Sequence, residues 1–96
     1  MELTIFARVH AREGEGANVE TALREQVPYA RGEPGCLGIE AYRSTRDPRL
    51  FTIHSRWSGE AAFDIHAERP STVRFVERME ALIDHPFEAT RARPIE

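Results

Sequence analysis

The hydrophobic residues of this chain change their spacing in an order that limits the folds open to it. Alternation typical of strands and the three- and four-residue spacing typical of helices follow one another along the sequence. We expect four strands, over residues 2–10, 36–44, 50–57 and 87–96, and two helical segments, over residues 17–31 and 58–83. The order β-α-β-β-α-β is that of the ferredoxin-like fold. The predicted fold class is therefore α+β, with an antiparallel four-stranded sheet.

The alternation also assigns each strand residue to one face of the sheet. The face expected to meet the helices carries Leu3, Ile5, Ala7, Val9, Leu37, Ile39, Ala41, Phe51, Ile53, Ser55 and Trp57. The opposite face carries Phe6, Gly38 and Tyr42 among Arg8, Glu40, Thr52 and His54. Two helices cover only one side of such a sheet, and monomers rarely leave a large apolar surface in water. We therefore expect a second copy to cover the open face, in a homodimer with two-fold symmetry.

The second helical segment combines a break with an apolar stripe. Ser58 is expected to cap its N-terminus. Arg69-Pro70 interrupts it, because the residue before a proline is disfavoured in helical geometry. The stripe carries Ala62, Phe63 and His66 before the break and Val73, Val76, Met79, Leu82 and Ile83 after it. The segment thus places an imidazole beside an apolar surface, close to the strand end at Trp57.

Composition excludes several classes of function. The 96 residues suit a single domain over 1–96. Without an apolar run of about 20 residues or a basic-then-apolar leader, we expect a cytoplasmic protein with no membrane partner. The net charge of -3 argues against nucleic acid as a partner, and the 13 basic residues are all arginine, which excludes lysine Schiff-base chemistry. The single cysteine, Cys36, excludes an intrachain disulfide and a zinc site built on cysteine pairs.

Four features occur in an order that resembles the antibiotic-biosynthesis-monooxygenase (ABM) domain family. They are EPGC at residues 33–36, a strand that ends in Trp57, an AxxFxxH-like spacing that leads to His66, and Pro70 shortly after it. The resemblance covers essentially the whole chain and implies a ferredoxin-like dimeric α/β barrel. Members of the family differ in activity. Some oxidise polycyclic phenols or quinols with O₂ and no metal or flavin, others degrade haem, and one branch acts on a phosphorylated sugar.

The resemblance assigns the site to Trp57 and His66. A flat phenolic substrate would lie against Trp57 in an apolar pocket between helices and sheet. His66 would be the general base, since histidine titrates near neutral pH. Phenol-oxidising members hold the substrate with an Asn and a Tyr at positions that are Ile53 and Phe63 here. With Ser55, which shares the face of Trp57, the predicted substrate-binding set is Trp57, Phe63, Ile53 and Ser55, and the catalytic residue is His66.

Each candidate also has a purely structural interpretation. A histidine on an apolar helix face is often a core residue bonded to a backbone carbonyl, and a tryptophan at a strand end often fills a corner. His10 and His54, on the open face, are candidates for a dimer interface or for the interior of a barrel. No metal site is expected, because Arg69 and Pro70 occupy the positions three and four residues after His66.

The expected function is that of a cofactor-independent monooxygenase, which oxidises a quinol- or polyphenol-type aromatic with O₂. Two alternatives stay open. One is a non-catalytic dimeric module that binds a hydrophobic small molecule, and the other is an isomerase or lyase that uses His66 and an arginine facing the pocket. Haem degradation is less favoured, because the first strand lacks the Asn of the haem-degrading members.

Overall fold

In the computed structural model, which describes all 96 residues, four strands form one antiparallel sheet. The strands are β1 (Leu3–His10), β2 (Cys36–Arg43), β3 (Leu50–Trp57) and β4 (Glu88–Ala92), in the order β2-β3-β1-β4. The register of the central pair sets Leu3 opposite Trp57 and His10 opposite Leu50. This topology confirms the ferredoxin-like α+β fold expected from the order of the hydrophobic periods.

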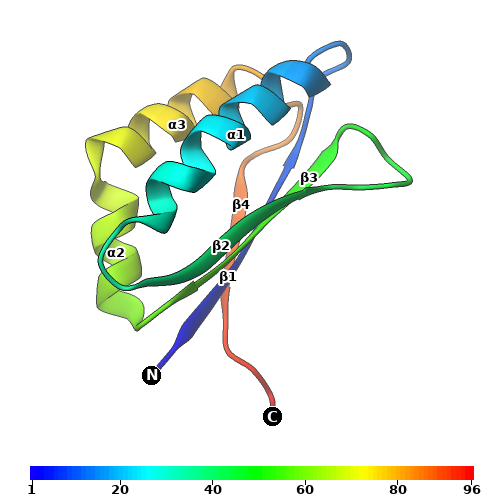
Figure 1. The fold of residues 1–96 in the computed structure, drawn as a ribbon. Helices are drawn as coiled ribbons and strands as arrows, with labels where there is room; N and C mark the ends of the chain where they lie inside the picture. The colour runs from blue at the N-terminus through cyan, green and yellow to red at the C-terminus, as the bar shows by residue number, and fades with distance from the viewer.

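Three helices cover one face of the sheet (Figure 1). They are α1 (Gly16–Arg31), α2 (Glu60–Glu68) and α3 (Pro70–Glu80). α1 and α3 lie side by side, and α2 lies over the end of the sheet where β3 finishes (Figure 1). None of these helices has both the length and the apolar character needed to cross a bilayer.

The hydrophobic core lies between the helices and the sheet. The apolar stripe of α1 is buried, with the three- and four-residue spacing expected of a helix over residues 17–31: Val19, Ala22, Leu23, Val27 and Ala30. Pro28 lies within α1 without ending it. The fully buried Trp57 belongs to a smaller cluster with Leu3 and Ile5, close to α2. The core therefore has two parts, and the second part lies under the helix that carries His66.

The break predicted at Arg69-Pro70 separates α2 from α3. Arg69 is extended (φ -61, ψ 139), and Pro70 occupies the first turn of α3, where a backbone N–H would have no helical partner in any case. The predicted cap was wrong. Gly59 precedes the first residue of α2, no side chain caps the helix, and Ser58 is exposed.

Two residues that were predicted to face the core, Leu37 and Val73, are exposed. Leu37 is exposed, because the register of β2 shifts between Cys36 and Gly38 and the bulge turns this side chain out. Val73 is exposed, because Pro70 starts a new helix whose stripe has a different phase. The buried residues of α3 are Thr72, Phe75 and Met79.

The ends of two elements differ from prediction as well. The last helix stops at Glu80, so Ile83 reaches the core from the segment that follows, where it bridges to Ala11. The last strand covers only Glu88–Ala92, and its side chains are mostly exposed. Both differences lie at element ends, which are the least sharply defined parts of a periodic pattern.

The other face of the sheet has no helix over it (Figure 1). Phe6 is 44% exposed and Tyr42 is 53% exposed on this face, as the alternation predicted. The ring of Phe6 stacks on His54 with their centroids 5.1 Å apart. Polar and charged side chains surround this pair, among them Arg8, Glu40, Thr52 and Arg56.

Candidate functional site

The turn between α1 and β2 places a carboxylate under α2. Gly35 has a φ of +84°, and a Cβ there would lie 2.6 Å from the Cβ of Ala62 on α2. Only glycine combines this backbone conformation with so close an approach. The backbone N–H of Ser58 donates to the carbonyl of Gly35 at 2.8 Å and so fixes the turn to the end of β3. Glu33, in the same turn, is thereby buried beneath α2.

Glu33 and His66 form a buried pair. The Nδ1–H of His66 donates to Oε1 of Glu33 at 3.0 Å, with Oε2 at 3.1 Å. Their side chains are 5% and 12% exposed, for Glu33 and His66 respectively. An ionised carboxylate only accepts hydrogen bonds, so Nδ1 must carry the proton. The other ring nitrogen of His66, Nε2, has no hydrogen-bond partner within the protein, which leaves its lone pair available in the neutral ring.

Arg69, at the break between α2 and α3, compensates the buried charge. Its Nε lies 2.9 Å from Oε1 of Glu33. The same Nε is a buried atom without an aligned hydrogen bond, so the contact is an ion pair held by charge rather than a directed bond. The carboxylate of Glu33 thus has a guanidinium on one side and an imidazole on the other. Its burial is tolerable because both are available to it.

Aromatic rings enclose the imidazole of His66. The ring of Trp57 lies 4.5 Å from it, centroid to centroid, at an angle of 32°, and the ring of Phe63 lies at 5.7 Å. The indole N–H of Trp57 donates to Oγ of Ser55 at 3.0 Å. Arg91 covers the outer face of Phe63, with Cζ 5.0 Å from the ring centroid. The orientation of His66 is therefore fixed by packing as well as by Glu33.

A cavity of about 260 Å³, partly open to solvent, lies between the helices and the sheet, next to His66. Its lining is mainly apolar. The lining residues are Ile5, Ala7, Leu23, Gln26, Val27, Ala30, Ile39, Ile53, Ser55, Phe63, His66, Ala67, Thr72, Phe75, Val76, Phe87 and Ala89. This cavity is where the family resemblance predicted a pocket, between the helices and the inward face of the sheet.

Four of the five predicted site residues line this cavity: Ile53, Ser55, Phe63 and His66. Trp57 does not line it. The indole is fully buried behind the lining and contacts three residues of it, His66, Phe63 and Ser55. The hydroxyl oxygen of Ser55 already accepts a hydrogen bond from Trp57. The hydroxyl of Ser55 can still donate its own proton to another partner.

Sequence reasoning missed four residues here: Glu33, Arg69, Gln26 and Thr72. Glu33 lies within the EPGC stretch, but nothing local shows that it meets a histidine 33 positions away. Gln26 and Thr72 gave a clearer signal. Each is a polar residue at a position where the apolar stripe of its helix, α1 or α3, would otherwise continue.

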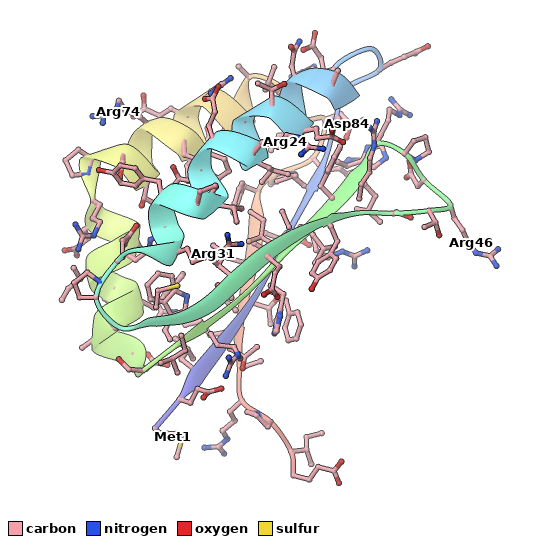
Figure 2. The ribbon with its side chains drawn as sticks, in the orientation of Figure 1. Met1, Arg24, Arg31, Arg46, Arg74 and Asp84 are labelled. Carbon is pink, nitrogen blue, oxygen red and sulfur yellow. The ribbon has the colours of Figure 1, made fainter.

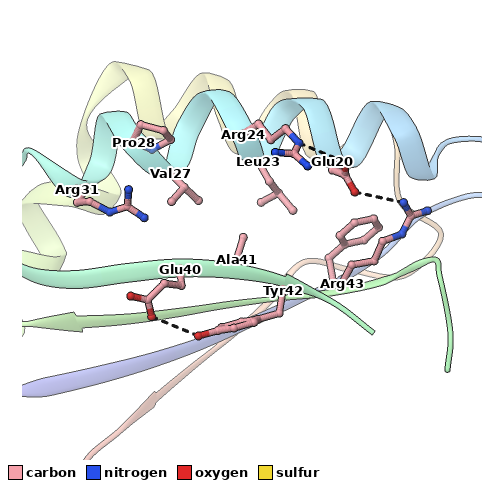
Figure 3. Close-up of a pocket in the computed structure, with 11 residues that line it drawn as sticks. Glu20, Leu23, Arg24, Val27, Pro28, Arg31, Glu40, Ala41, Tyr42 and Arg43 are labelled. Carbon is pink, nitrogen blue, oxygen red and sulfur yellow. Dashed lines mark hydrogen bonds and ion pairs between the residues drawn. The ribbon is translucent and has the colours of Figure 1, made fainter. Parts of the chain in front are cut away.

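A second hollow, of about 500 Å³, lies between α1 and the edge strand β2 (Figure 3). Its arginines are already engaged. Arg24 and Arg43 pair with Glu20, and Arg31 donates to the carbonyl of Ile39 at 2.9 Å. It is larger than the cavity at His66, but it is more open to solvent and its lining is more polar. We therefore place the candidate site at His66 and not in this groove.

His10, at the end of β1, has a different set of contacts. Its Nδ1 lies 2.8 Å from Oδ1 of Asp84 and its Nε2 lies 2.9 Å from Oδ2 of Asp47. Hydrogen bonds to Asp84 and then to Asp47 raise the pKa of His10 above its ordinary value. With His85, these residues include the one group of side chains whose geometry suits a metal ion, with ligand atoms of His10, Asp84 and His85 within 4.8 Å of one another.

Most other charged side chains point away from the protein, as Figure 2 shows for Arg46 at the β2–β3 hairpin and Arg74 on α3. Cys36 is a half-buried free thiol that packs against both parts of the core. Its burial raises the pKa of the thiol. Such a cysteine behaves as a small apolar residue rather than as a nucleophile.

Comparison with known proteins gives one family and a set of close folds. Residues 3–78 match the family model described as antibiotic biosynthesis monooxygenase. No curated protein matches the sequence. Among solved structures, PA3566 from Pseudomonas aeruginosa is 27% identical with a TM-score of 0.90, over 99% of this chain and 95% of its own.

Two further structures are similar mainly in fold. Rv0793 from Mycobacterium tuberculosis superimposes with a TM-score of 0.93 at 20% identity, over 100% of this chain and 97% of its own. A crystal structure described as an antibiotic biosynthesis monooxygenase superimposes with a TM-score of 0.91 at 24% identity, over 98% of this chain and 99% of its own.

Proposed function

The chain belongs to the antibiotic biosynthesis monooxygenase family, and on that premise we propose that it oxidises a quinol- or polyphenol-type aromatic with O₂ in the cavity beside His66. One observation carries the proposal. His66 lines a mainly apolar cavity with Nδ1 held by Glu33 and Nε2 left without a partner. This is the arrangement that a general base needs, because the carboxylate fixes the tautomer and stabilises the imidazolium that forms.

The proposed reaction starts with the transfer of a phenolic proton to Nε2 of His66. The resulting phenolate is electron-rich and reduces O₂, and a bond then forms between ring carbon and oxygen. Loss of water gives a quinone. One oxygen atom of O₂ becomes a carbonyl of the product and the other leaves as water, so a hydroquinone yields a hydroxyquinone. No external reductant is needed, since the substrate supplies all four electrons.

The other lining residues position the ring and keep the site dry. Ile53 and Phe63 provide apolar walls, and Trp57 holds His66 from behind. Exclusion of water strengthens the electrostatic effect of Glu33 on His66. It also protects the two radicals that form when the phenolate gives one electron to O₂ from competing reactions. Ser55, whose oxygen accepts from Trp57, has its proton free for a ligand oxygen. We place the substrate-binding role on Ile53, Ser55 and Phe63, and a supporting role on Trp57.

Oxygen consumption with a panel of hydroquinones tests this proposal. We expect His66→Ala to lower the rate by about 10²- to 10⁴-fold, the usual contribution of a general base. His85→Ala is the matched control, because this histidine is exposed in the segment after α3 and does not line the cavity. No uptake of O₂ with any substrate, or equal rates for wild type and His66→Ala, would contradict the proposal.

The second candidate function is a non-catalytic binding module, which the mainly apolar cavity supports by itself. It predicts that phenols raise the melting temperature without any consumption of O₂. The isomerase or lyase alternative has less support, because it requires an arginine that faces the pocket and none lines the cavity.

We also propose that a second copy of the chain covers the open face of the sheet. Phe6 and Tyr42 are exposed there among residues of both charge signs, so two copies related by a two-fold axis pair apolar with apolar and acid with arginine. Light scattering at micromolar concentration should give the mass of a dimer for the wild type and that of a monomer for Phe6→Glu. A monomer mass for the wild type would contradict this.

A further inference from the structure

Two polar atoms of the cavity lining are buried without a hydrogen-bond partner. They are Nε2 of Gln26 and Oγ1 of Thr72. Thr72 is only 8% exposed. Buried polar atoms are nearly always paired, and leaving one unpaired reduces stability, so each exception calls for a physical reason. Both unpaired residues line the same cavity, so a ligand in that cavity could supply the missing hydrogen-bond partners.

The polar groups of the lining come mainly from the helices. Gln26 lies on α1, His66 on α2 and Thr72 on α3. The sheet contributes a floor that is apolar apart from Ser55, whose oxygen is bonded to Trp57: Ile5, Ala7, Ile39, Ile53 and Ala89. A ligand in this space therefore meets an apolar floor and hydrogen-bonding groups on three different helices.

We propose that Gln26 and Thr72 bind a second oxygen substituent of the ligand, separate from the oxygen whose proton His66 takes. This inference rests on the proposed function for the position of the reacting oxygen. The amide Nε2 of Gln26 is a donor, so the ligand supplies an acceptor, and the hydroxyl of Thr72 donates or accepts as required. A hydroxyl or a carbonyl on the ring satisfies both residues.

The size of the cavity limits the number of rings. An apolar cavity of about 150 Å³ is enough to hold benzene. The cavity here is about 260 Å³, which suits one or two rings and is too small for a four-ring polyphenol. The ligand class is thus a mono- or bicyclic aromatic with two oxygen substituents, and a dihydroxynaphthalene is a suitable probe.

Anaerobic calorimetry with a matched pair of ligands tests the inference. We expect wild type to bind 1,4-dihydroxynaphthalene at least about tenfold more tightly than 1-naphthol, since the latter leaves the second site unpaired. Thr72→Val and Gln26→Leu should remove most of this preference and leave the affinity for 1-naphthol nearly unchanged. Glu25→Gln, an exposed change next to Gln26, is the control and should keep the preference.

A second readout uses the protein without ligand. Thr72→Val removes an unpaired buried hydroxyl, so it should raise the melting temperature by a few degrees while it weakens binding of the diol. A purely structural role for Thr72 predicts the opposite shift. Equal affinity of wild type for the two ligands, no binding of either, or a preference that survives in both variants would overturn the inference. Preferential binding of the diol without O₂ uptake would overturn the proposed oxidation alone.

Discussion

Three histidines of this protein are bonded to carboxylates, and two of them, His66 and His10, differ in which ring nitrogen is left free. His66 uses only Nδ1, in a bond to Glu33, and its ring lies between aromatic side chains beside an apolar cavity. His10 uses both ring nitrogens, in bonds to Asp84 and Asp47 near the surface. Two bonds to ionised carboxylates require two protons on the ring, so His10 is positively charged while both bonds are made. His66 keeps a nitrogen that can accept a proton.

The positions of the two histidines in the fold match this difference. His10 connects the end of β1 to Asp47 in the β2–β3 hairpin and to Asp84 in the segment after α3, whose backbone N–H donates to the carbonyl of His10 at 3.0 Å. It holds three segments together. His66 contacts the turn before β2 and the end of β3, and it borders the cavity. A histidine bonded to carboxylates thus has two different roles in this fold. His10, with Asp47 and Asp84, forms a structural clamp, by which we mean a side chain that holds three segments together, and His66, with Glu33, forms a candidate base.

The largest effect that separates the two regions is expected from their carboxylates. Glu33→Gln keeps the size of the side chain but removes the charge that stabilises the imidazolium and the tautomer of His66, so kcat/KM should fall by about 10²- to 10⁴-fold. Asp84→Asn makes the same change at His10 and should leave kcat/KM unaltered. The comparison fails if both variants lose activity equally or if Glu33→Gln remains fully active.

An effect on stability is expected at the clamp. The pKa of His10 is higher in the folded protein than in the unfolded chain. Its contribution to the free energy of unfolding is therefore complete below about pH 6.5, the usual pKa of a histidine in an unfolded chain, and is lost as the pH rises through the pKa of the folded state. The pKa of Asp47 is lowered by hydrogen bonds from the Arg49 amide and from His10, and that of Asp84 by hydrogen bonds from His85 and from His10. The contribution of these two carboxylates to the stability of the fold is therefore lost in acid.

Melting curves of wild type and His10→Gln at a series of pH values check this. The difference in melting temperature should be greatest between about pH 4 and pH 6.5 and should shrink towards pH 9. A difference that is constant from pH 5 to pH 9 would show that the charge of His10 does not contribute. His54→Gln provides the comparison for a histidine without a carboxylate partner.

The smallest effect concerns Cys36, which lies beside the Trp57 cluster. Because burial raises its pKa, alkylation by iodoacetamide should be slow, and its rate should still increase above pH 8.5, where a free thiol is half ionised. Mass spectrometry of the intact chain measures this rate. A fast reaction with a midpoint below pH 8.5 would show that the region around Trp57 is more open than the structure indicates.

The fold and half of the site follow from local patterns in the sequence. The strand and helix periods gave the topology, and His66, Phe63 and Ile53 lie where their faces predicted. Leu37 and Val73 escaped prediction because a bulge and a proline change the phase of a pattern without changing its composition. Such shifts are visible only when neighbouring elements are in place.

The rest of the site depends on contacts between distant segments. Glu33 reaches His66 only because Gly35 lets the turn approach α2 closely, and no periodicity encodes that approach. Gln26 and Thr72 were readable in principle, since a polar residue at a buried stripe position departs from the pattern of its own helix. The useful rule is that exceptions to an amphipathic stripe mark places where a cavity needs a hydrogen-bonding group.

The most direct test of the account is to find where the protons lie on the two imidazoles. Long-range ¹H–¹⁵N correlation spectra of the ligand-free protein identify the protonated nitrogens of each histidine. In the neutral form of His66 the proton should be on Nδ1, and Nε2 should be bare, whereas His10 should still carry protons on both nitrogens above about pH 6.5, the usual pKa of a histidine side chain. A proton on Nε2 of neutral His66, or loss of a ring proton from His10 at or below about pH 6.5, would contradict the distinction between a base and a clamp.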